Sequence, residues 1–339
     1  MSAATREGLP HGAATALAID AAYVPAGELP RLLDMPETLL GIVTFGDDAV
    51  RIDGVPHAHV SMPFLAGEPL VEVWRSGEPV RQGREGQIRF AANAHVVFGV
   101  ATASAEPSRL TASAEKLYRD ILRFTEKKGY PHFLRMWNHF PRINSTDVPE
   151  GNYQAFCVGR HDGFASAHHD FERELPAASG VGTSAGDLVI YFIASTTPGI
   201  HLENPRQVSA YHYPRQYGPR SPSFARATKK RWHHETQLFV SGTASVVGHE
   251  SLHPGDVRMQ TLETLENIRM VFAAATNERI ERWPAGALVK SYLRRPEELA
   301  LVREIVVSEF PPDTRHIFLH GEICRPELLV EIEAILRWK

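Results

Sequence analysis

The sequence predicts an α/β (α+β) fold in which two β-sheets are each covered by helices. In the second half, short apolar runs typical of strands alternate with segments whose apolar residues recur every three or four positions, as in amphipathic helices. The first half repeats this order in weaker form. A polar segment rich in proline and glycine, residues 145–151, separates the two. These observations together indicate an internal duplication.

The second half is expected to start its sheet with a strand over residues 236–246. Asp256 is a suitable N-cap for the following helix, because its side chain can accept a hydrogen bond from a free N–H group of the first turn. Pro296 favours the start of a second helix, because proline is tolerated in the first turn. The apolar stripe of the first helix comprises Leu262, Leu265, Ile268 and Phe272, and further strands are expected at 288–292, 316–319 and 328–335.

The first half is expected to contain the equivalent strand, helix and strand. Residues 97–104 match residues 238–245 at a constant offset, and a helix follows whose apolar stripe begins at Ala114 and which Gly129 ends. The next strand is expected over residues 133–137. We place the boundary of the duplication between an N-terminal domain, residues 1–148, and a C-terminal domain, residues 149–339.

Composition limits the classes of function. The chain has 339 residues, 43% of them hydrophobic, and lacks both an apolar run of about 20 residues and an N-terminal secretory pattern, so we expect a cytoplasmic protein that does not bind membranes. A formal net charge of −4 argues against nucleic-acid binding and favours a small-molecule partner. Cys157 and Cys324 are the only cysteines and are expected to be free thiols.

The last predicted strand presents two different faces. Its alternation places Val330, Ile332 and Ala334 on one face and Leu329, Glu331 and Glu333 on the other. One interpretation is an edge strand whose acids are solvated. The other is a strand that packs under helices on its apolar face and offers a carboxylate to a pocket, because buried acids are usually paired or functional.

Two motifs are set aside. Gly182–Gly186 matches the G-x-S-x-G pattern around Ser184, but we expect a loop before it and a strand after it, whereas a hydrolase nucleophile needs a strand and then a helix. No metal site is expected either. The candidate histidine clusters lack a third ligand at a recognised spacing: His168-His169-Asp170, His233-His234-Glu235 and His57-Ala-His59.

Two segments carry candidate anion-binding residues. Residues 211–226 interleave tyrosines and arginines, including Tyr213 and Arg226, and such groups can bind carboxylates, although a solvated basic loop is the alternative. Residues 153–162 are expected to form a strand containing Tyr153 and Arg160. Their spacing of seven places them on opposite faces of a regular strand, so both could serve one pocket only if Gly159 marks a bulge or the strand end.

Longer motifs resemble a known family. Residues 240–268 together with residues 329–334 resemble the RidA (YjgF-like) fold. The chain as a whole, including residues 136–144 and 153–164, resembles the chorismatases, with a match over most of residues 90–339. The resemblance implies two RidA-like units, a degenerate N-terminal one and a C-terminal one that carries most of the active site. It also implies an enzyme that cleaves chorismate and releases pyruvate, without a metal or an organic cofactor.

The resemblance also implies roles for individual residues. Glu331 matches the family's catalytic glutamate, the expected proton donor, and Cys324 and Gly242 resemble the branch that forms 3-hydroxybenzoate, a building block for secondary metabolism such as antibiotic biosynthesis. Arg160 and Arg226 are the expected carboxylate clamps, with Tyr153 and Tyr213 as hydroxyl partners. A hydrolytic chorismatase and a non-catalytic binder of small anions are the alternatives. Whether the chain is a monomer or a trimer stays open.

Overall fold

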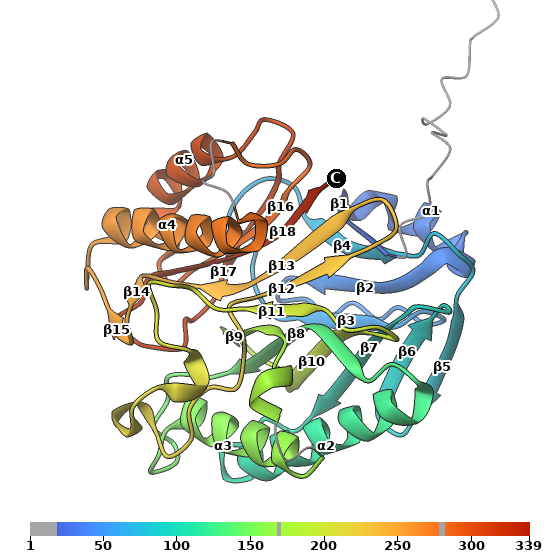
Figure 1. The fold of residues 1–339 in the computed structure, drawn as a ribbon, viewed down its shortest axis with the longest axis horizontal. Coiled ribbons are helices and arrows are strands. Elements are labelled where there is room, and N and C mark those ends of the chain that lie inside the picture. Colours follow the sequence, from blue (N-terminus) through green and yellow to red (C-terminus); the bar gives the residue numbers. More distant parts are fainter. Residues whose placement is uncertain (1–18, 168–170, 278–281) are drawn as a thin grey trace, which may run out of the picture.

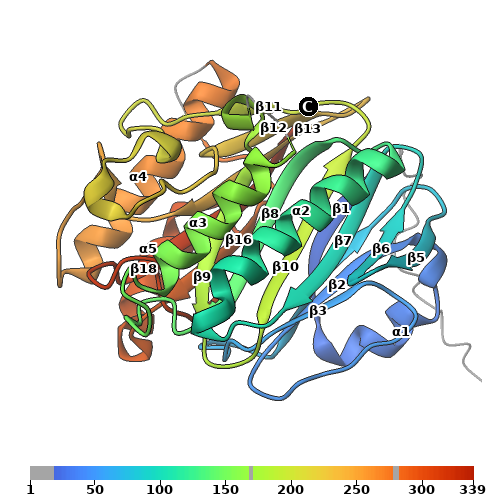
Figure 2. The same ribbon diagram turned by 90° about the horizontal axis from the view of Figure 1, so that it is seen from below.

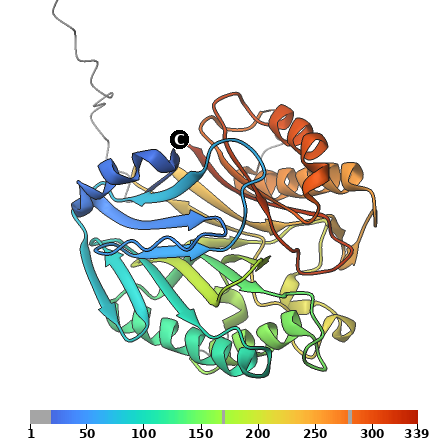
Figure 3. The ribbon, with the colours of Figure 1, turned by 180° about the vertical axis from the view of Figure 1, so that it is seen from behind.

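Three β-sheets surround a common core in this computed structural model, which describes residues 19–167, 171–277 and 282–339 (Figure 1). Two sheets have six strands and one has four. Helices cover the outer faces of both six-stranded sheets, whereas the four-stranded sheet closes the remaining side of the core, as the view from behind shows (Figure 3). Among the described helices, none is long and apolar enough to span a membrane.

The first six-stranded sheet is formed by residues 81–195. Its strands, in spatial order, are β5 (Arg81–Glu85), β6 (Ile88–Ala92), β7 (Val96–Ala103), β10 (Leu188–Ser195), β8 (His132–Pro141) and β9 (Ala177–Thr183). Helices α2 (Leu110–Lys128) and α3 (Asn152–Ala165) lie side by side across its outer face (Figure 2).

The second six-stranded sheet is formed by residues 200–338. Its spatial order is β11 (Ile200–Leu202), β12 (Ala227–Arg231), β13 (Thr236–Thr243), β18 (Val330–Trp338), β16 (Leu288–Leu293) and β17 (Arg315–His320), with α4 (Val257–Thr276) and α5 (Leu299–Glu309) outside. Both sheets therefore share one topology, in which the sixth strand of the unit inserts between its third and fourth strands and the fourth and fifth strands are parallel. The predicted duplication is confirmed.

The remaining elements are smaller. The four-stranded sheet has the order β1 (Asp20–Pro25), β4 (Leu70–Arg75), β2 (Leu39–Phe45) and β3 (His57–Val60), with the short helix α1 (Leu29–Leu33) beside it. A two-stranded ribbon joins β14 (Val246–Val247) and β15 (Glu250–Ser251). Short 3₁₀ helices are η1 (Ala26–Glu28), η2 (Pro36–Thr38), η3 (Pro107–Arg109), η4 (Phe171–Glu174), η5 (Ala210–His212), η6 (Arg215–Tyr217) and η7 (Pro296–Glu298).

The predicted boundary at residue 148 does not coincide with the division between the sheets. It falls between β8 and α3, inside the first unit, because β9 and β10 return to pair with β8 and β7. The division that the pairing supports lies between Ser195 and Ile200. The four-stranded sheet was not predicted at all, so the chain contains two duplicated units and a third sheet.

The local helix signals are confirmed. The Asp256 side chain accepts a hydrogen bond from the Met259 N–H at 3.0 Å, and Gly129 ends α2 in the left-handed conformation with φ of 84°. Leu265, Ile268 and Phe272 of α4 are buried, but the expectation for Leu262 was wrong, since this side chain is 46% exposed.

The prediction of a strand over residues 153–162 was wrong, because these residues lie in α3. Two glycines lower the intrinsic helix propensity of this segment. They are needed because α3 packs directly against α2: a Cβ on Gly159 would lie 2.2 Å from the Thr111 carbonyl oxygen, and one on Gly163 would lie 2.5 Å from Tyr118 Cβ. Close helix packing therefore outweighs local propensity.

The segment before Ser184 was also predicted wrongly, because Ala177–Thr183 is strand β9 and not a loop. Ser184 lies in the turn between β9 and β10, so the segment after it is a strand, as expected, and not the helix of a hydrolase elbow. In the part of the chain that the structure describes, no three His, Cys, Asp or Glu side chains gather as metal ligands would. His168, His169 and Asp170 lie outside the described residues.

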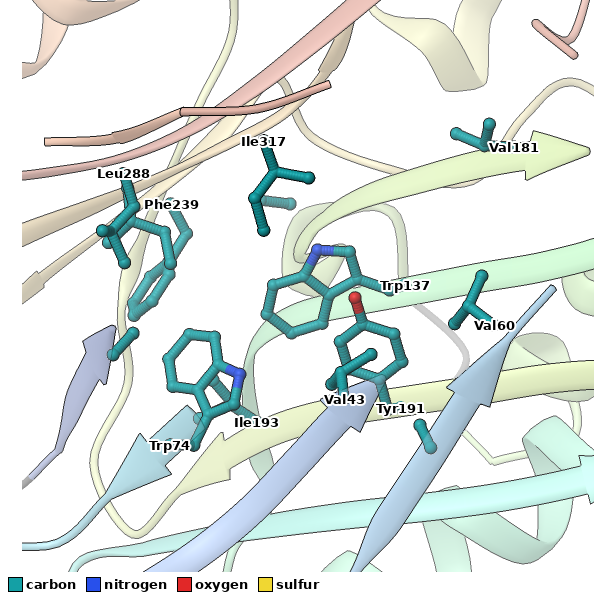
Figure 4. Close-up of a cluster of buried hydrophobic side chains, with 14 of the residues drawn as sticks. Val43, Val60, Trp74, Trp137, Val181, Tyr191, Ile193, Phe239, Leu288 and Ile317 are labelled. Carbon is teal, nitrogen blue, oxygen red and sulfur yellow. The ribbon is translucent and has the colours of Figure 1, made fainter. Parts of the chain in front are cut away.

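The central core lies where the three sheets meet. Trp74 of the four-stranded sheet, Trp137 and Tyr191 of the first unit, and Phe239 and Leu288 of the second all contribute to it (Figure 4). Trp137 stacks on Tyr191 with ring centroids 4.5 Å apart. Separate apolar layers lie between each six-stranded sheet and its helices. This core fixes the inner faces of both large sheets, including that of β18.

Candidate functional site

A cavity of about 300 Å³ brings together six of the seven residues predicted from the sequence. Its lining combines elements of both units: the start of α3, the segment between β11 and β12, β13, β18 and the loop between β17 and β18. The predicted residues that line it are Tyr153, Tyr213, Arg226, Gly242, Cys324 and Glu331. Arg160 is the one that does not.

Glu331 lies on a central strand, because β18 pairs with β13 on one side and β16 on the other. Val330, Ile332 and Ala334 pack into the layer under the helices, so the carboxyl groups of Glu331 and Glu333 face the interior, as the alternation predicted. Both glutamates are at most 5% exposed. The alternative of an edge strand with solvated acids was therefore wrong.

The Glu331 carboxyl is held in its protonated form. Burial raises its pKa to about 8, the negative charge of Glu333 adds to this, and Arg135 acts in the opposite direction. No hydrogen bond or ion pair joins this carboxyl to another described residue. A carboxylic acid with this pKa that faces a cavity can donate a proton at neutral pH.

Gly242 makes room for this carboxyl. The register between β13 and β18 shifts between Val240 and Thr243, which places a bulge at Gly242. A Cβ there would lie 2.0 Å from Glu331 Oε1 and 2.8 Å from its Cδ. Any side chain at this position would therefore displace the Glu331 carboxyl. The Gly242 N–H donates to Ser179 Oγ at 3.0 Å.

Glu333, in contrast, is surrounded by donors. Its carboxylate accepts hydrogen bonds from Arg135 Nη2 at 2.7 Å, Trp137 Nε1 at 2.9 Å and Ser179 Oγ at 2.5 Å, and it pairs with Lys290 Nζ at 3.0 Å. Burial alone would raise its pKa, but Lys290, Arg135 and the Ser179 hydroxyl outweigh burial and lower the pKa to about 2. Glu333 is therefore ionised under all physiological conditions.

Two arginines line the cavity, and the sequence predicted only one of them. Arg226 Nη2 donates to Tyr213 Oη at 2.8 Å and to the Val208 carbonyl at 2.9 Å, while its buried Nε has no hydrogen-bond partner among the described residues. Arg325 lies over the Tyr217 ring at 4.0 Å. Its position directly after Cys324 was the available sequence signal for a role in this site.

Backbone contacts fix the loop that carries Cys324 and Arg325. Arg294 Nη2 donates to the Ile323 carbonyl at 2.8 Å and the Arg325 carbonyl at 3.1 Å, and its Nε donates to the Leu328 carbonyl at 2.8 Å. Arg294 thus joins both ends of the loop. Arg325 Nη1 in turn donates to the His249 carbonyl at 2.9 Å. These hydrogen bonds fix the positions of Cys324 and Arg325 at the cavity.

Arg160 lies behind the wall of the cavity, where it is 4% exposed. Its guanidinium lies 5.2 Å from the centre of the Tyr118 ring, and its Nε and Nη2 have no hydrogen-bond partner in the described structure. On a helix, a spacing of seven residues brings Tyr153 and Arg160 to the same face. The prediction that they lie on opposite faces was wrong because it assumed a strand.

Cys324 is a partly buried free thiol at the cavity. Burial raises its pKa to about 12, and the charge that Glu331 would carry adds to this. The group is a thiol and not a thiolate at neutral pH, so it can shape the cavity and donate a weak hydrogen bond but is a poor nucleophile. Cys157 is buried and its pKa is also raised to about 12 by burial.

Comparisons with known proteins place the chain among related sequences. Residues 72–194 match a family model described as "Chorismatase FkbO/Hyg5-like, N-terminal". The chain is 37% identical over 314 residues to a 3-hydroxybenzoate synthase of Streptomyces hygroscopicus, covering 88% of this chain and 91% of the relative. It is 34% identical over 314 residues to a chorismatase of the same organism, with 90% and 91% covered.

A solved structure of a chorismatase superposes on the fold with a TM-score of 0.86 and 31% sequence identity, covering 96% of this chain and all of that one. The family model matches the first six-stranded unit, and the two relatives extend over both units. The extent of these matches shows the family: this chain belongs to the chorismatases.

Proposed function

We propose that this protein converts chorismate to 3-hydroxybenzoate and pyruvate. The observation that carries the proposal is the protonated carboxyl of Glu331 facing a cavity that also contains two arginines. A relative with 37% identity is named 3-hydroxybenzoate synthase, which supports this choice within the family.

Substrate binding follows from the charges of the cavity. Chorismate carries two carboxylates, and the cavity offers the guanidinium groups of Arg226 and Arg325, joined by Tyr213, which hydrogen-bonds the first and lies 5.3 Å from the second. The aromatic rings of Tyr153 and Phe224 supply apolar surface for the ring of the substrate. The bound dianion would raise the pKa of Glu331 further, because a nearby negative charge disfavours a second one.

Catalysis begins with the enol ether of the substrate. Glu331 donates its proton to the terminal methylene carbon, and the carboxylate left behind stabilises the oxocarbenium ion that forms. The ring 4-hydroxyl then gives its proton to the Glu331 carboxylate and displaces the ether oxygen within the molecule, and pyruvate leaves. The resulting arene oxide opens to the phenol. This reaction consumes no water. The almost complete burial of Glu331 and the thiol of Cys324 beside it leave little room for water near the reacting group, which fits this reaction.

The test is incubation of the purified protein with chorismate, followed by identification of the ring product by chromatography and mass and by counting pyruvate. We expect 3-hydroxybenzoate and pyruvate in equal amounts. A ring product heavier by one water would identify the hydrolytic reaction instead. Absence of pyruvate would leave a binding protein.

Cys324→Ala tests the branch of the family. We expect the smaller side chain to let water reach the oxocarbenium ion, so that part of the product becomes the hydrolysed dihydroxycyclohexadiene carboxylate. Cys157→Ala is the matched control, because this second thiol does not line the cavity, and its product should stay unchanged. An unchanged product from Cys324→Ala would remove the basis for choosing this branch.

A further inference from the structure

A buried cluster of four charged side chains lies directly behind the proposed proton donor. Glu333 pairs with Arg135 Nη2 at 2.7 Å and with Lys290 Nζ at 3.0 Å, and Lys290 Nζ pairs in turn with Glu72 at 2.6 Å. Glu72 also accepts a hydrogen bond from Trp74 Nε1 at 2.7 Å. None of the four is more than 5% exposed. Two carboxylates and two cations balance, so the cluster as a whole is neutral.

Ser179 connects the cluster to the surroundings of Glu331. The Ser179 hydroxyl donates a hydrogen bond to Glu333 at 2.5 Å and accepts one from the Gly242 N–H at 3.0 Å. The Cβ position of Gly242 lies 3.0 Å from Ser179 Oγ and 2.0 Å from Glu331 Oε1. The serine hydroxyl and the donor carboxyl therefore both border the space where a Gly242 side chain would project, and the Ser179 hydroxyl links that space to Glu333.

We propose that Glu333 is a positioning residue for the reaction: with Arg135, Lys290 and Glu72 it sets the charge balance behind the Glu331 carboxyl, and through Ser179 it fixes the backbone beneath Glu331. This inference rests on the proposed function of Glu331 as the donor.

The net charge that each substitution leaves in the cluster predicts the direction in which the pKa of Glu331 shifts. Glu333→Gln would leave Arg135 and Lys290 opposed by Glu72 alone, a net positive charge that favours the ionised form of Glu331. Lys290→Met would leave Glu333 and Glu72 opposed by Arg135 alone, a net negative charge that favours the protonated form. The two substitutions change the same cluster but should shift the pKa of Glu331 in opposite directions.

The other groups that face Glu331 do not titrate in the relevant range. Tyr292 of β16 lies opposite Glu331 in the sheet register, and its pKa is raised by burial, as is that of the Cys324 thiol. His139 of β8 stays neutral, because burial and Lys290 lower its pKa to about 3. Tyr153 of α3 has a pKa raised by burial, and Arg226 and Arg325 are the cations that line the cavity.

The experiment is the pH profile of kcat at saturating chorismate for the wild type, Glu333→Gln and Lys290→Met. The wild type should lose activity as pH rises above about 8, because bound chorismate raises the pKa of Glu331 further. We expect the alkaline limb of Glu333→Gln to move to lower pH by about one pH unit and that of Lys290→Met to move to higher pH. A purely structural role would lower kcat equally at every pH.

Alkaline limbs that coincide in all three proteins would overturn the inference. If Glu333→Gln does not fold, the alkaline limb of Lys290→Met is sufficient to test the inference. Glu72→Gln removes the same charge as Glu333→Gln, but Glu72 lies beyond Lys290 in the cluster. Its alkaline limb should therefore move to lower pH by a smaller amount. Failure of the proposed function is distinguishable, because the wild type would then release no pyruvate or Glu331→Gln would stay active. If Glu331→Gln is inactive but the alkaline limbs of Glu333→Gln and Lys290→Met coincide with that of the wild type, the result would contradict this inference and leave the proposed function standing.

Discussion

Glu331 and Glu333 stand two residues apart on one strand and face the same side, yet their surroundings give them opposite charge states. Both are buried, but the pKa of Glu331 is raised to about 8 and that of Glu333 is lowered to about 2. The difference comes from partners on other strands, since Arg135, Lys290 and Ser179 reach Glu333 and no described residue forms a hydrogen bond with Glu331. Such divergent pairs are typical of acid–base sites.

The duplicated units differ at the same strand. β10 occupies in the first sheet the place that β18 occupies in the second. Its centre-facing side chains are Val189, Tyr191 and Ile193, which belong to the apolar core, where β18 presents Glu331 and Glu333. The equivalent strands of the two units therefore differ in role, because one builds the core and the other builds the site.

The largest expected effect follows from removal of the proton donor. Glu331→Gln keeps the shape of the side chain but cannot protonate the enol ether, so kcat should fall by about 10²–10⁴-fold. Steady-state pyruvate release measures this. Glu327→Gln is the matched control, since Glu327 lines the same cavity but is exposed, and its kcat should change little. Nearly normal turnover by Glu331→Gln would contradict the assignment.

The second effect is a loss of folding stability when Glu333, the glutamate with ion-pair partners, is replaced. Glu333→Gln leaves two buried cations with one fewer partner and should cost about 3–5 kcal/mol of unfolding free energy at neutral pH. Because the pKa of Glu333 is lowered in the fold, this contribution is present above its unfolded value and is lost as pH falls through about 2. Urea unfolding at several pH values measures it, and a loss below about 1 kcal/mol would show that the cluster is not stabilising.

The third effect has the opposite sign, because the unpartnered acid costs stability. A folded pKa of about 8 means that the native state binds a proton that the unfolded state releases, so stability falls as pH rises from about 4.5 to about 8. Glu331→Gln removes this cost and should be more stable than the wild type by on the order of 3 kcal/mol at pH 7. The gain should vanish near pH 4.5, and a gain independent of pH would point to another cause.

The smallest effect comes from crowding of the donor. Gly242→Ala places a Cβ 2.0 Å from Glu331 Oε1, so the carboxyl must move, and we expect kcat to fall by about tenfold to a hundredfold. Gly180→Ala is the control, since its nearest contact would be Tyr153 Cε2 at an ordinary 3.6 Å. Equal kcat values for the two variants would show that the position of the Glu331 carboxyl is not restricted by Gly242.

The positions of the two glutamates could be predicted from local sequence patterns, whereas their charge states could not. The alternation of β18 predicted that both glutamates share a face, and the caps at Asp256 and Gly129 placed two helices. The charge of each glutamate depends on residues far away in the sequence, which no spacing reveals. The helix α3 was missed for the same reason, because Gly159 and Gly163 only make sense against the surface of α2.

The site residues divide in the same way. Glu331 and Gly242, which lie in family-like motifs, and Cys324, chosen from its resemblance to one branch of the family, could be predicted and do line the cavity. Arg160 also lies in a family-like motif and was chosen as a clamp because the expected substrate has two anionic ends, but the structure places it behind the wall. Arg325 was missed because its role depends on stacking over Tyr217, a contact across the cavity between two loops.

The most direct test of the account is an infrared titration of the protonated carboxyl band, taken as the difference between wild type and Glu331→Gln. A C=O band assigned to Glu331 should persist through pH 7 and disappear only near pH 8. Loss of that band by pH 5, near the value of an ordinary glutamate, would show that Glu331 is ionised at neutral pH and would contradict its role as the proton donor.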